Sequence, residues 1–224
     1  MRTRFAFGLL ILGMLCVLVT VVWAQEVVVV DFGQASDEVP PGWQLSEKEG
    51  KADLALLYDT DGQVLRLRSN ASSFSIEKQV DVDLKQTPFL VWTWMVTEVP
   101  KGGDFRTRVT DDQAGQLLVL FHWGYIRKEA IAYIWDSTAP QGTMAKAPSP
   151  AMYPLFNIKA VVVRSGETET GKWIIETRNV VEDYKRLFGR EPKKVQGIRI
   201  QINSQHTNSH AEAYWKSVEF KVRP

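Results

Sequence analysis

The stretch VQGIRIQIN, at residues 195–203, decides the class of fold. Ile198, Ile200 and Ile202 alternate with polar residues along it. In a β-strand, successive side chains point to opposite faces, so this alternation predicts a strand with one buried and one solvated face.

The same pattern extends outward from this stretch. AYWKSVEFKV, at 213–222, alternates in the same way, and most other apolar runs are short and rich in β-branched or aromatic residues. Turn residues separate them, as in DTDGQ at 59–63. The further strands expected are 26–32, 54–59, 63–69, 73–80, 88–96, 116–123, 130–136, 158–164 and 172–180. We therefore predict an all-β fold, in which two antiparallel sheets form a β-sandwich of the jelly-roll, lectin or carbohydrate-binding-module kind.

One segment, NVVEDYKRLFGREP at 179–192, has helical signals instead. Asn179 can cap the first turn, with Glu182 three residues later. Gly189 and then Pro192 are typical of a helix end. The sequence thus predicts one short helix and a single domain over residues 25–224.

The N-terminal residues 1–24 have the layout of a secretory signal peptide. Arg2 and Arg4 precede an apolar run that ends before Ala24. An uncleaved anchor is the alternative, because a run of about 18 residues approaches the ~20 that a membrane span needs. We expect cleavage after Ala24 and an exported protein, periplasmic or secreted, with no stable membrane insertion.

Composition narrows the classes of partner and site. Cys16 is the one cysteine, so the mature chain can form neither a disulfide nor a zinc-thiolate site. The chain has 27 basic and 26 acidic residues, and removing Arg2 and Arg4 leaves 25 against 26. A nearly neutral chain argues against nucleic acid as a partner, since nucleic acid selects basic surfaces.

Two adjacent carboxylates precede an apolar run in RTRVTDDQAGQLLVLFHWG, at 106–124. Asp111 and Asp112, with Asp104, could supply oxygen ligands to calcium. They could also act as an acid/base couple, although neighbouring side chains on a strand point to opposite faces. The simplest interpretation is turn chemistry, in which one aspartate bonds backbone amides and the other meets a nearby arginine. We expect no cofactor, with calcium as the alternative.

The three histidines are candidate metal ligands or catalytic partners. His206 and His210 stand four residues apart with Glu212 nearby, but the segment joins two strands and reads as a polar hairpin loop. His122 follows a buried strand and is expected at the core or its rim.

Aromatic residues supply candidates for both the core and a ligand rim. Trp92 and Trp94 fall on one face of a strand and are expected to fill the core. The proline-rich segment 137–156 is a long loop, and long ordered loops are often functional. The predicted ligand-binding residues are Asp111, Asp112, Trp123, Tyr125, Tyr133, Trp135 and Tyr153.

The order of several segments resembles the bacterial family known as domain of unknown function 3047. The segments are PPGWQL, VDVDLKQTPFLVWTWMV, TDDQAGQLLVLF, IAYIWD, NVVEDYKRLFG and AYWKSVEF, and they cover about residues 31–222. The resemblance implies an exported single-domain β-sandwich without an established activity.

Two departures from the family pattern concern the acidic site. The resemblance implies an acidic turn before the last strand, where this chain has residues 203–207, NSQHT. It also implies an arginine after the paired aspartates, where this chain has Gly115 and Gln116. A metal role for Asp111 and Asp112 is weakened accordingly.

No hydrolase signature is present, neither a Gly-x-Ser-x-Gly elbow nor a His-Glu-x-x-His motif. The leading hypothesis is therefore a non-catalytic β-sandwich that binds a glycan or another small ligand. One alternative is a carbohydrate-processing hydrolase that uses Asp111 or Asp112, with His122 as partner. Another is a structural protein of the envelope, held by a sheet edge or an apolar patch.

Overall fold

The computed structural model describes residues 27–28, 32, 39–123, 128–148 and 156–224. The predicted signal segment, 1–24, lies outside these residues. Within the described part of the chain, no helix is both long and apolar enough to cross a membrane.

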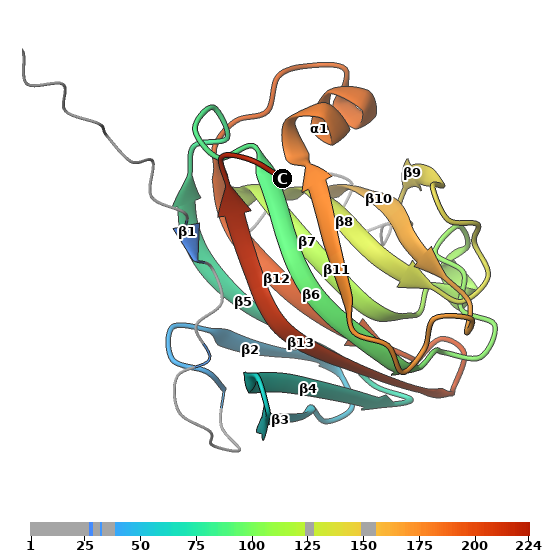
Figure 1. The fold of residues 1–224 in the computed structure, drawn as a ribbon. Coiled ribbons are helices and arrows are strands. Elements are labelled where there is room, and N and C mark those ends of the chain that lie inside the picture. Colours follow the sequence, from blue (N-terminus) through green and yellow to red (C-terminus); the bar gives the residue numbers. More distant parts are fainter. Residues whose placement is uncertain (1–26, 29–31, 33–38, 124–127, 149–155) are drawn as a thin grey trace, which may run out of the picture.

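Two β-sheets stacked on each other form the body of the molecule, with one helix at the top of the view in Figure 1. The first sheet contains β1 (Val27–Val28), β3 (Asp53–Asp59), β4 (Gly62–Asn70), β6 (Phe89–Glu98), β11 (Ile174–Asn179) and β13 (His210–Lys221). The second contains β2 (Gln44–Glu49), β5 (Ser73–Val82), β7 (Gln113–Trp123), β8 (Lys128–Asp136), β9 (Met144–Lys146), β10 (Phe156–Ser165) and β12 (Val195–Asn203). A 3-10 turn, η1 (Arg108–Thr110), precedes β7, and α1 spans Val180–Phe188.

The predicted β-sandwich is confirmed, with one correction to the antiparallel pairing. The six-stranded sheet has the order β11-β6-β13-β4-β3, with β1 beside β13, and the seven-stranded sheet has the order β2-β5-β12-β7-β8-β10-β9. In the latter, β8 and β10 are parallel. Parallel neighbours need a long crossover connection, and the predicted loop after Asp136 provides it.

Tryptophans from both sheets meet in the core. Trp92 and Trp94 of β6, Trp135 of β8 and Trp215 of β13 are all fully buried. The ring centroid of Trp94 lies 5.7 Å from that of Trp92, 5.6 Å from Trp135 and 5.2 Å from Trp215. These spacings are those of interacting aromatic pairs, and they confirm the prediction that Trp92 and Trp94 fill the core.

The helix α1 connects an edge of one sheet to the interior of the other. Asn179 caps it, accepting hydrogen bonds from the backbone N–H groups of Val181 and Glu182 at 3.1 and 3.2 Å. Gly189 follows with a left-handed backbone, φ 69°, which glycine adopts without steric cost. Both ends of the predicted helix are therefore confirmed.

Two strands have no signal in the hydrophobic pattern. All six residues of β2 are exposed, and β9 is three residues long within the proline-rich segment. These strands exist because β5 and β10 offer them unpaired backbone groups. Both lie at sheet edges, where polar residues can form a strand without a buried face.

Candidate functional site

A cavity of about 630 Å³ lies on the outer face of the seven-stranded sheet, away from the tryptophan core. That volume is within the range of small-molecule sites, roughly 300–1,000 Å³. Its described lining comprises Ser46, Lys48, Ser73, Phe74, Ser75, Phe105, Asp111, Gln113, Gln116, Leu118, Ala132, Ile134, Ala147, Pro148, Phe156, Ile158, Ala160, Arg199, Gln201 and Asn203. The floor is built from β2, β5, β12, β7, β8 and β10.

One half of the floor is lined mainly by hydroxyl and amide side chains, together with the charged residues Asp111 and Arg199. The strand register places Ser46 beside Ser75, Ser75 beside Gln201, and Gln201 beside Gln116. This row crosses four strands, and each member offers hydrogen-bond donors and acceptors. In β12 the row is outward-facing because the alternate positions, such as Ile200, point into the core.

The other half of the floor is aliphatic and made of small residues. Leu118 lies beside Ala132, and Ala132 beside Ala160, with Ile134 and Ile158 nearby in the lining. Because the alanine side chains are short, they leave space above this part of the sheet. The floor therefore changes from polar to apolar at β7.

Phe105 forms part of the wall over the apolar half. The buried carboxylate of Asp136 accepts its backbone N–H at 2.9 Å, and also those of Thr138 and Ala139 at 2.9 and 2.7 Å. Burial raises the pKa of Asp136, against the opposing effect of these three amides. Asp136 thus fixes the loop that carries Phe105.

Asp111 is a half-buried carboxylate in the cavity lining. Its Oδ1 accepts a hydrogen bond from Gln113 Nε2 at 3.1 Å. Burial raises the pKa of Asp111 to about 6, against the opposing effects of Gln113, His206 and Lys48. The carboxyl group of Asp111 therefore takes up a proton at a higher pH than a solvent-exposed aspartate does.

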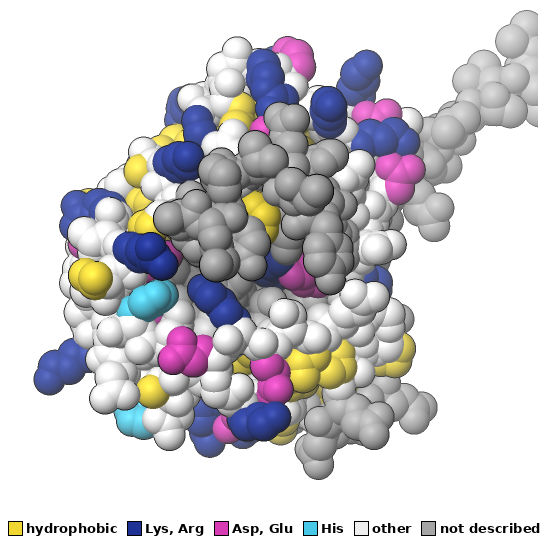
Figure 2. Space-filling model, turned by 180° about the vertical axis from the view of Figure 1, so that it is seen from behind, with side chains coloured by type: hydrophobic (Ala, Val, Ile, Leu, Met, Phe, Trp, Pro, Cys, Tyr) yellow, Lys and Arg dark blue, Asp and Glu magenta, His cyan; other side chains and the backbone are white. Residues whose placement is uncertain are grey.

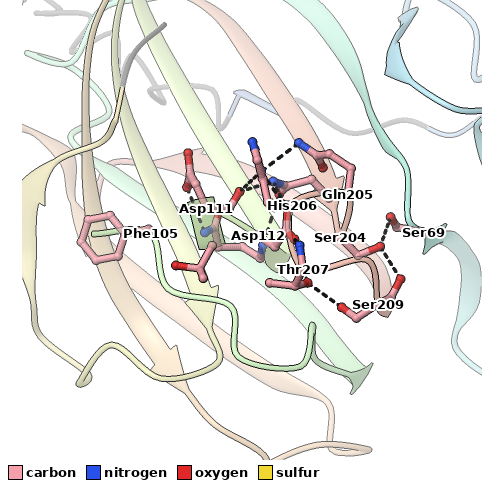
Figure 3. Close-up of polar contacts among 12 residues, drawn as sticks. Ser69, Phe105, Asp111, Asp112, Ser204, Gln205, His206, Thr207 and Ser209 are labelled. Carbon is pink, nitrogen blue, oxygen red and sulfur yellow. Dashed lines mark hydrogen bonds and ion pairs between the residues drawn. The ribbon is translucent and has the colours of Figure 1, made fainter. Parts of the chain in front are cut away.

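Asp112 has no exposed surface, and Figure 3 shows it beside His206 and Thr207 of the turn that follows β12. Its Oδ2 accepts the backbone N–H of Thr207 at 2.7 Å and the hydroxyl of Thr207 at 2.8 Å. Its Oδ1 lies 3.1 Å from Asn203 Nδ2 and 3.2 Å from His206 Nδ1. Asp112 therefore ties the start of β7 to the turn between β12 and β13, and it is absent from the cavity lining.

Asn203 connects the interior of this corner with the cavity. Its Nδ2 donates to the backbone carbonyl of Asp111 at 2.5 Å, and its Oδ1 accepts from Gln113 N at 3.2 Å and from Gln116 Nε2. The arrangement holds Gln113 and Gln116 in place beside Asp111.

The predicted calcium ligands Asp104, Asp111 and Asp112 do not come together. Both carboxylate oxygens of Asp104 bind the Arg106 guanidinium, at 2.9 and 2.6 Å, and this arginine lowers the pKa of Asp104 to about 2. Asp111 faces the cavity while Asp112 faces the 203–207 turn. Among the described residues, no group of three or more His, Cys, Asp or Glu could hold a metal ion.

The histidine pair is also divided. His206 Nδ1 approaches Asp112, whereas His210 is an exposed residue at the start of β13. Glu212 instead accepts from Arg68, at 3.0 and 2.7 Å, and from Thr97 Oγ1 at 2.7 Å. The hairpin-loop interpretation therefore agrees with where these side chains lie.

Two predicted rim aromatics prove to be core residues. Tyr133 and Trp135 have no exposed surface. The hydroxyl of Tyr133 donates to Asp183 at 3.0 Å, and Trp135 Nε1 donates to the carbonyl of Gly166 at 2.9 Å. A ring without exposed surface cannot stack on a ligand, so the prediction was wrong for both. At these two positions of β8 the side chains point into the core between the sheets.

The remaining aromatic residues that were predicted to bind ligand cannot be placed among the described side chains. Tyr125 and Tyr153 are not among the described residues, and the side chains of His122 and Trp123 in β7 are not described either. The proline-rich segment does reach the cavity, because Ala147 and Pro148 contribute to its lining.

Sequence reasoning missed most of the floor. The alternation in VQGIRIQIN marked Arg199 and Gln201 as residues on the solvated face, but the pattern alone does not say which solvated positions become concave. Ser46 and Lys48 lie in a strand with no hydrophobic signal. The floor could have been predicted from one pattern in the sequence: several expected strands have polar residues at their outward-facing positions.

The comparisons with known proteins give a family and several likenesses of shape. A family model described as "Protein of unknown function (DUF3047)" matches residues 41–219, and no curated protein matches. A family 11 carbohydrate-binding module of a cellulosomal cellulase from Clostridium thermocellum is similar, with 8% identity, a TM-score of 0.48, and coverage of 88% of this chain and 94% of that chain.

Two further solved structures are similar at the same level. The xyloglucanase domain of NopAA from Sinorhizobium fredii has 9% identity, a TM-score of 0.46, and coverage of 85% of this chain and all of that one. A cellulase derived from Rhodothermus marinus Cel12A has 8% identity, a TM-score of 0.46, and coverage of 87% and 100%. With TM-scores below 0.5, these similarities say nothing about what this chain binds.

Proposed function

The chain belongs to the family of proteins of unknown function DUF3047, and we propose that it is a non-catalytic binding protein for a glycan-type ligand. The proposed site is the cavity on the outer face of the seven-stranded sheet. We also propose that residues 1–24 direct export, as the signal-like sequence predicts.

The composition of the cavity floor carries this proposal. A sugar presents hydroxyl groups at its edge and C–H groups on its faces. The row Ser46, Ser75, Gln201 and Gln116 matches the hydroxyl groups with donors and acceptors. The aliphatic half around Leu118 matches the C–H faces. A volume of about 630 Å³ has room for a short oligosaccharide rather than a single ion.

The arrangement of carboxylates favours binding over hydrolysis. Most glycosidases place two carboxylates on either side of the scissile bond. Asp111 is the one carboxylate in the described lining. The carboxylate of Asp112 lies outside the lining and contacts Thr207, Asn203 and His206. In the alternative of a hydrolase that uses Asp111 or Asp112 with His122 as partner, Asp111 is the aspartate that lines the cavity, and the side chain of His122 lies outside the described residues.

The face seen in Figure 2 offers little support for the alternative of an assembly protein. Its described hydrophobic side chains gather in small, separate groups among polar and charged ones. Stable protein partners more often bind contiguous apolar patches.

A glycan array with the full chain, followed by calorimetry on the best ligand, tests the proposal. We expect binding that Gln201→Ala weakens about tenfold, as the loss of a hydrogen-bonded side chain predicts. Gln63→Ala is the matched control, because Gln63 lies in β4 of the other sheet. Absence of binding across neutral and acidic glycans would overturn the proposal.

A further inference from the structure

The cavity floor contains a cation whose hydrogen-bonding capacity is not used up. Arg199 of β12 lines the cavity and forms an ion pair with Glu77 of β5. Its Nε is buried and has no hydrogen-bond partner among the described residues. A buried donor without a partner costs free energy, which a ligand oxygen at this point would recover.

A second cation stands at the rim. Lys48 of β2 is an exposed residue of the same lining, and no ion pair joins it to another described side chain. Glu77 balances the charge of Arg199, so Lys48 and Asp111 are the charged residues of the lining that have no ion-pair partner among the described residues. Because burial raises the pKa of Asp111, the cavity becomes more positive as the pH falls towards 6.

Arg199 also begins a continuous apolar row. The register places Arg199 beside Leu118, Leu118 beside Ala132, and Ala132 beside Ala160. Neighbouring strands are about 4.8 Å apart, so the row extends roughly 14 Å from the backbone of Arg199 to that of Ala160. One end of the row suits an anion, and the remainder suits the C–H face of a sugar ring.

We propose that the ligand is an acidic oligosaccharide of the uronate class, in which one carboxylate binds Arg199, the charge of Lys48 attracts the ligand to the same cavity, and the rings lie on Leu118, Ala132 and Ala160. This inference rests on the proposed function and adds the charge and orientation of the ligand. A guanidinium binds a carboxylate by directed hydrogen bonds, and an ammonium adds a mobile point charge.

The test compares two forms of one oligosaccharide by calorimetry with the full chain. The probes are trigalacturonate and its methyl ester, which differ in charge and not in sugar. We expect the free acid to bind at least tenfold more tightly, with a preference that shrinks as salt rises.

The variants locate this preference. Glu77→Gln with Arg199→Gln removes the ion pair as a unit and is expected to bring the affinity for the acid down to that for the ester. Asp53→Asn with Arg66→Gln is the matched control, because Arg66 is likewise paired with a carboxylate and has a buried, unpartnered Nε, on the opposite sheet. That control should leave the preference intact.

Lys48→Gln keeps the inference falsifiable if the double variant at Glu77 and Arg199 fails to fold. Lys48 is exposed, so its replacement should preserve the fold and reduce the preference for the acid severalfold. Equal binding of acid and ester by the unaltered protein would overturn the acidic-ligand inference and leave glycan binding standing. A preference for a sulfated oligosaccharide over trigalacturonate would overturn the carboxylate assignment. Failure of every glycan would overturn the proposed function itself.

Discussion

Asp111 and Asp112 are adjacent in the chain, yet their carboxyl groups have different surroundings. Asp111 faces the cavity with Gln113 as its hydrogen-bond partner. Asp112 is fully buried and accepts hydrogen bonds from the turn that leads into β13. Backbone geometry before β7 therefore separates a residue available to ligand from one that holds the structure together.

We predict that Asp112→Asn destabilises the fold, although Asp112 does not line the cavity. The amide cannot accept from both sides as the carboxylate does, so a hydrogen bond from Thr207 or His206 is lost. The expected loss in the free energy of unfolding is about 1–3 kcal/mol. Urea unfolding measures it, with Asp81→Asn, an exposed ion-pair residue, as a control expected within about 0.5 kcal/mol of the unaltered protein. Equal stability of both variants would contradict the anchoring role.

We predict that Asp111→Asn stabilises the protein at pH 8 and has a shrinking effect as the pH falls to 4. The pKa of Asp111 rises from 3.8 to about 6 on folding, so the folded state binds its proton more tightly. Its contribution to stability is therefore present below pH 3.8 and lost as the pH rises through 6. A shift of about two units corresponds to at most about 3 kcal/mol.

Thermal melts of both proteins between pH 4 and pH 8 check this prediction. The charged groups near Asp111 include Lys48, His206 and Asp112. A His206→Gln background removes the effect of His206 on the pKa of Asp111. A constant difference between the two proteins across the pH range would show that Asp111 is not buried as described.

At the scale of the element, α1 is held by polar contacts of two adjacent buried residues, Asp183 and Tyr184. Asp183 accepts two hydrogen bonds from Arg178, at 2.9 and 2.6 Å, and one from Tyr133. The hydroxyl of Tyr184 donates to Glu129 at 2.5 Å, and Arg190 donates to the same carboxylate at 2.6 Å. The helix thus ties β11 of one sheet to β8 of the other.

We predict that Asn179→Ala costs about 1 kcal/mol, the usual value for losing a helix N-cap. Two amides, those of Val181 and Glu182, lose their acceptor. In a domain of this size the midpoint of thermal unfolding should fall by about 2–4 °C. Asn179→Asp, which can also cap, should restore it, whereas no change in Asn179→Ala would mean that water replaces the cap without cost.

At the scale of the whole molecule, the two outer faces differ. The six-stranded sheet presents ion pairs such as Arg68–Glu212 and Arg66–Asp53. The seven-stranded sheet presents the cavity, with its polar and aliphatic halves. The two outer faces belong to different sheets, with the tryptophan core between them. Substitutions in the cavity should therefore leave the ion pairs of the six-stranded sheet unchanged.

We predict that neither EDTA nor added calcium shifts the melting midpoint. A metal that binds the folded state raises its stability by mass action. Asp104 is neutralised by Arg106, and Asp112 is occupied by donors, so no calcium ligand set forms from the predicted aspartates. A rise of several degrees in the melting midpoint on addition of calcium would contradict this prediction and make Asp111 the first residue to test as a calcium ligand.

Periodicity predicted the sandwich, the single helix and the burial of Trp92 and Trp94, because side-chain direction along a strand or helix follows from local geometry. The same periodicity could not separate Tyr133 and Trp135 from a ligand rim, since both faces of β8 carry apolar residues. Nor could it detect β2, whose polar residues form a strand through pairing with β5.

The sequence by itself determined the all-β class, the helix and its caps, and the absence of cysteine chemistry from residues 25–224, since these depend on residue type and local spacing. Only the tertiary structure decided that Asp112 is internal, that Asp111 faces a cavity, and that Arg199 lies in line with Leu118, Ala132 and Ala160. The physical reason is strand register: it aligns residues far apart in the chain, and it is set by packing between whole sheets.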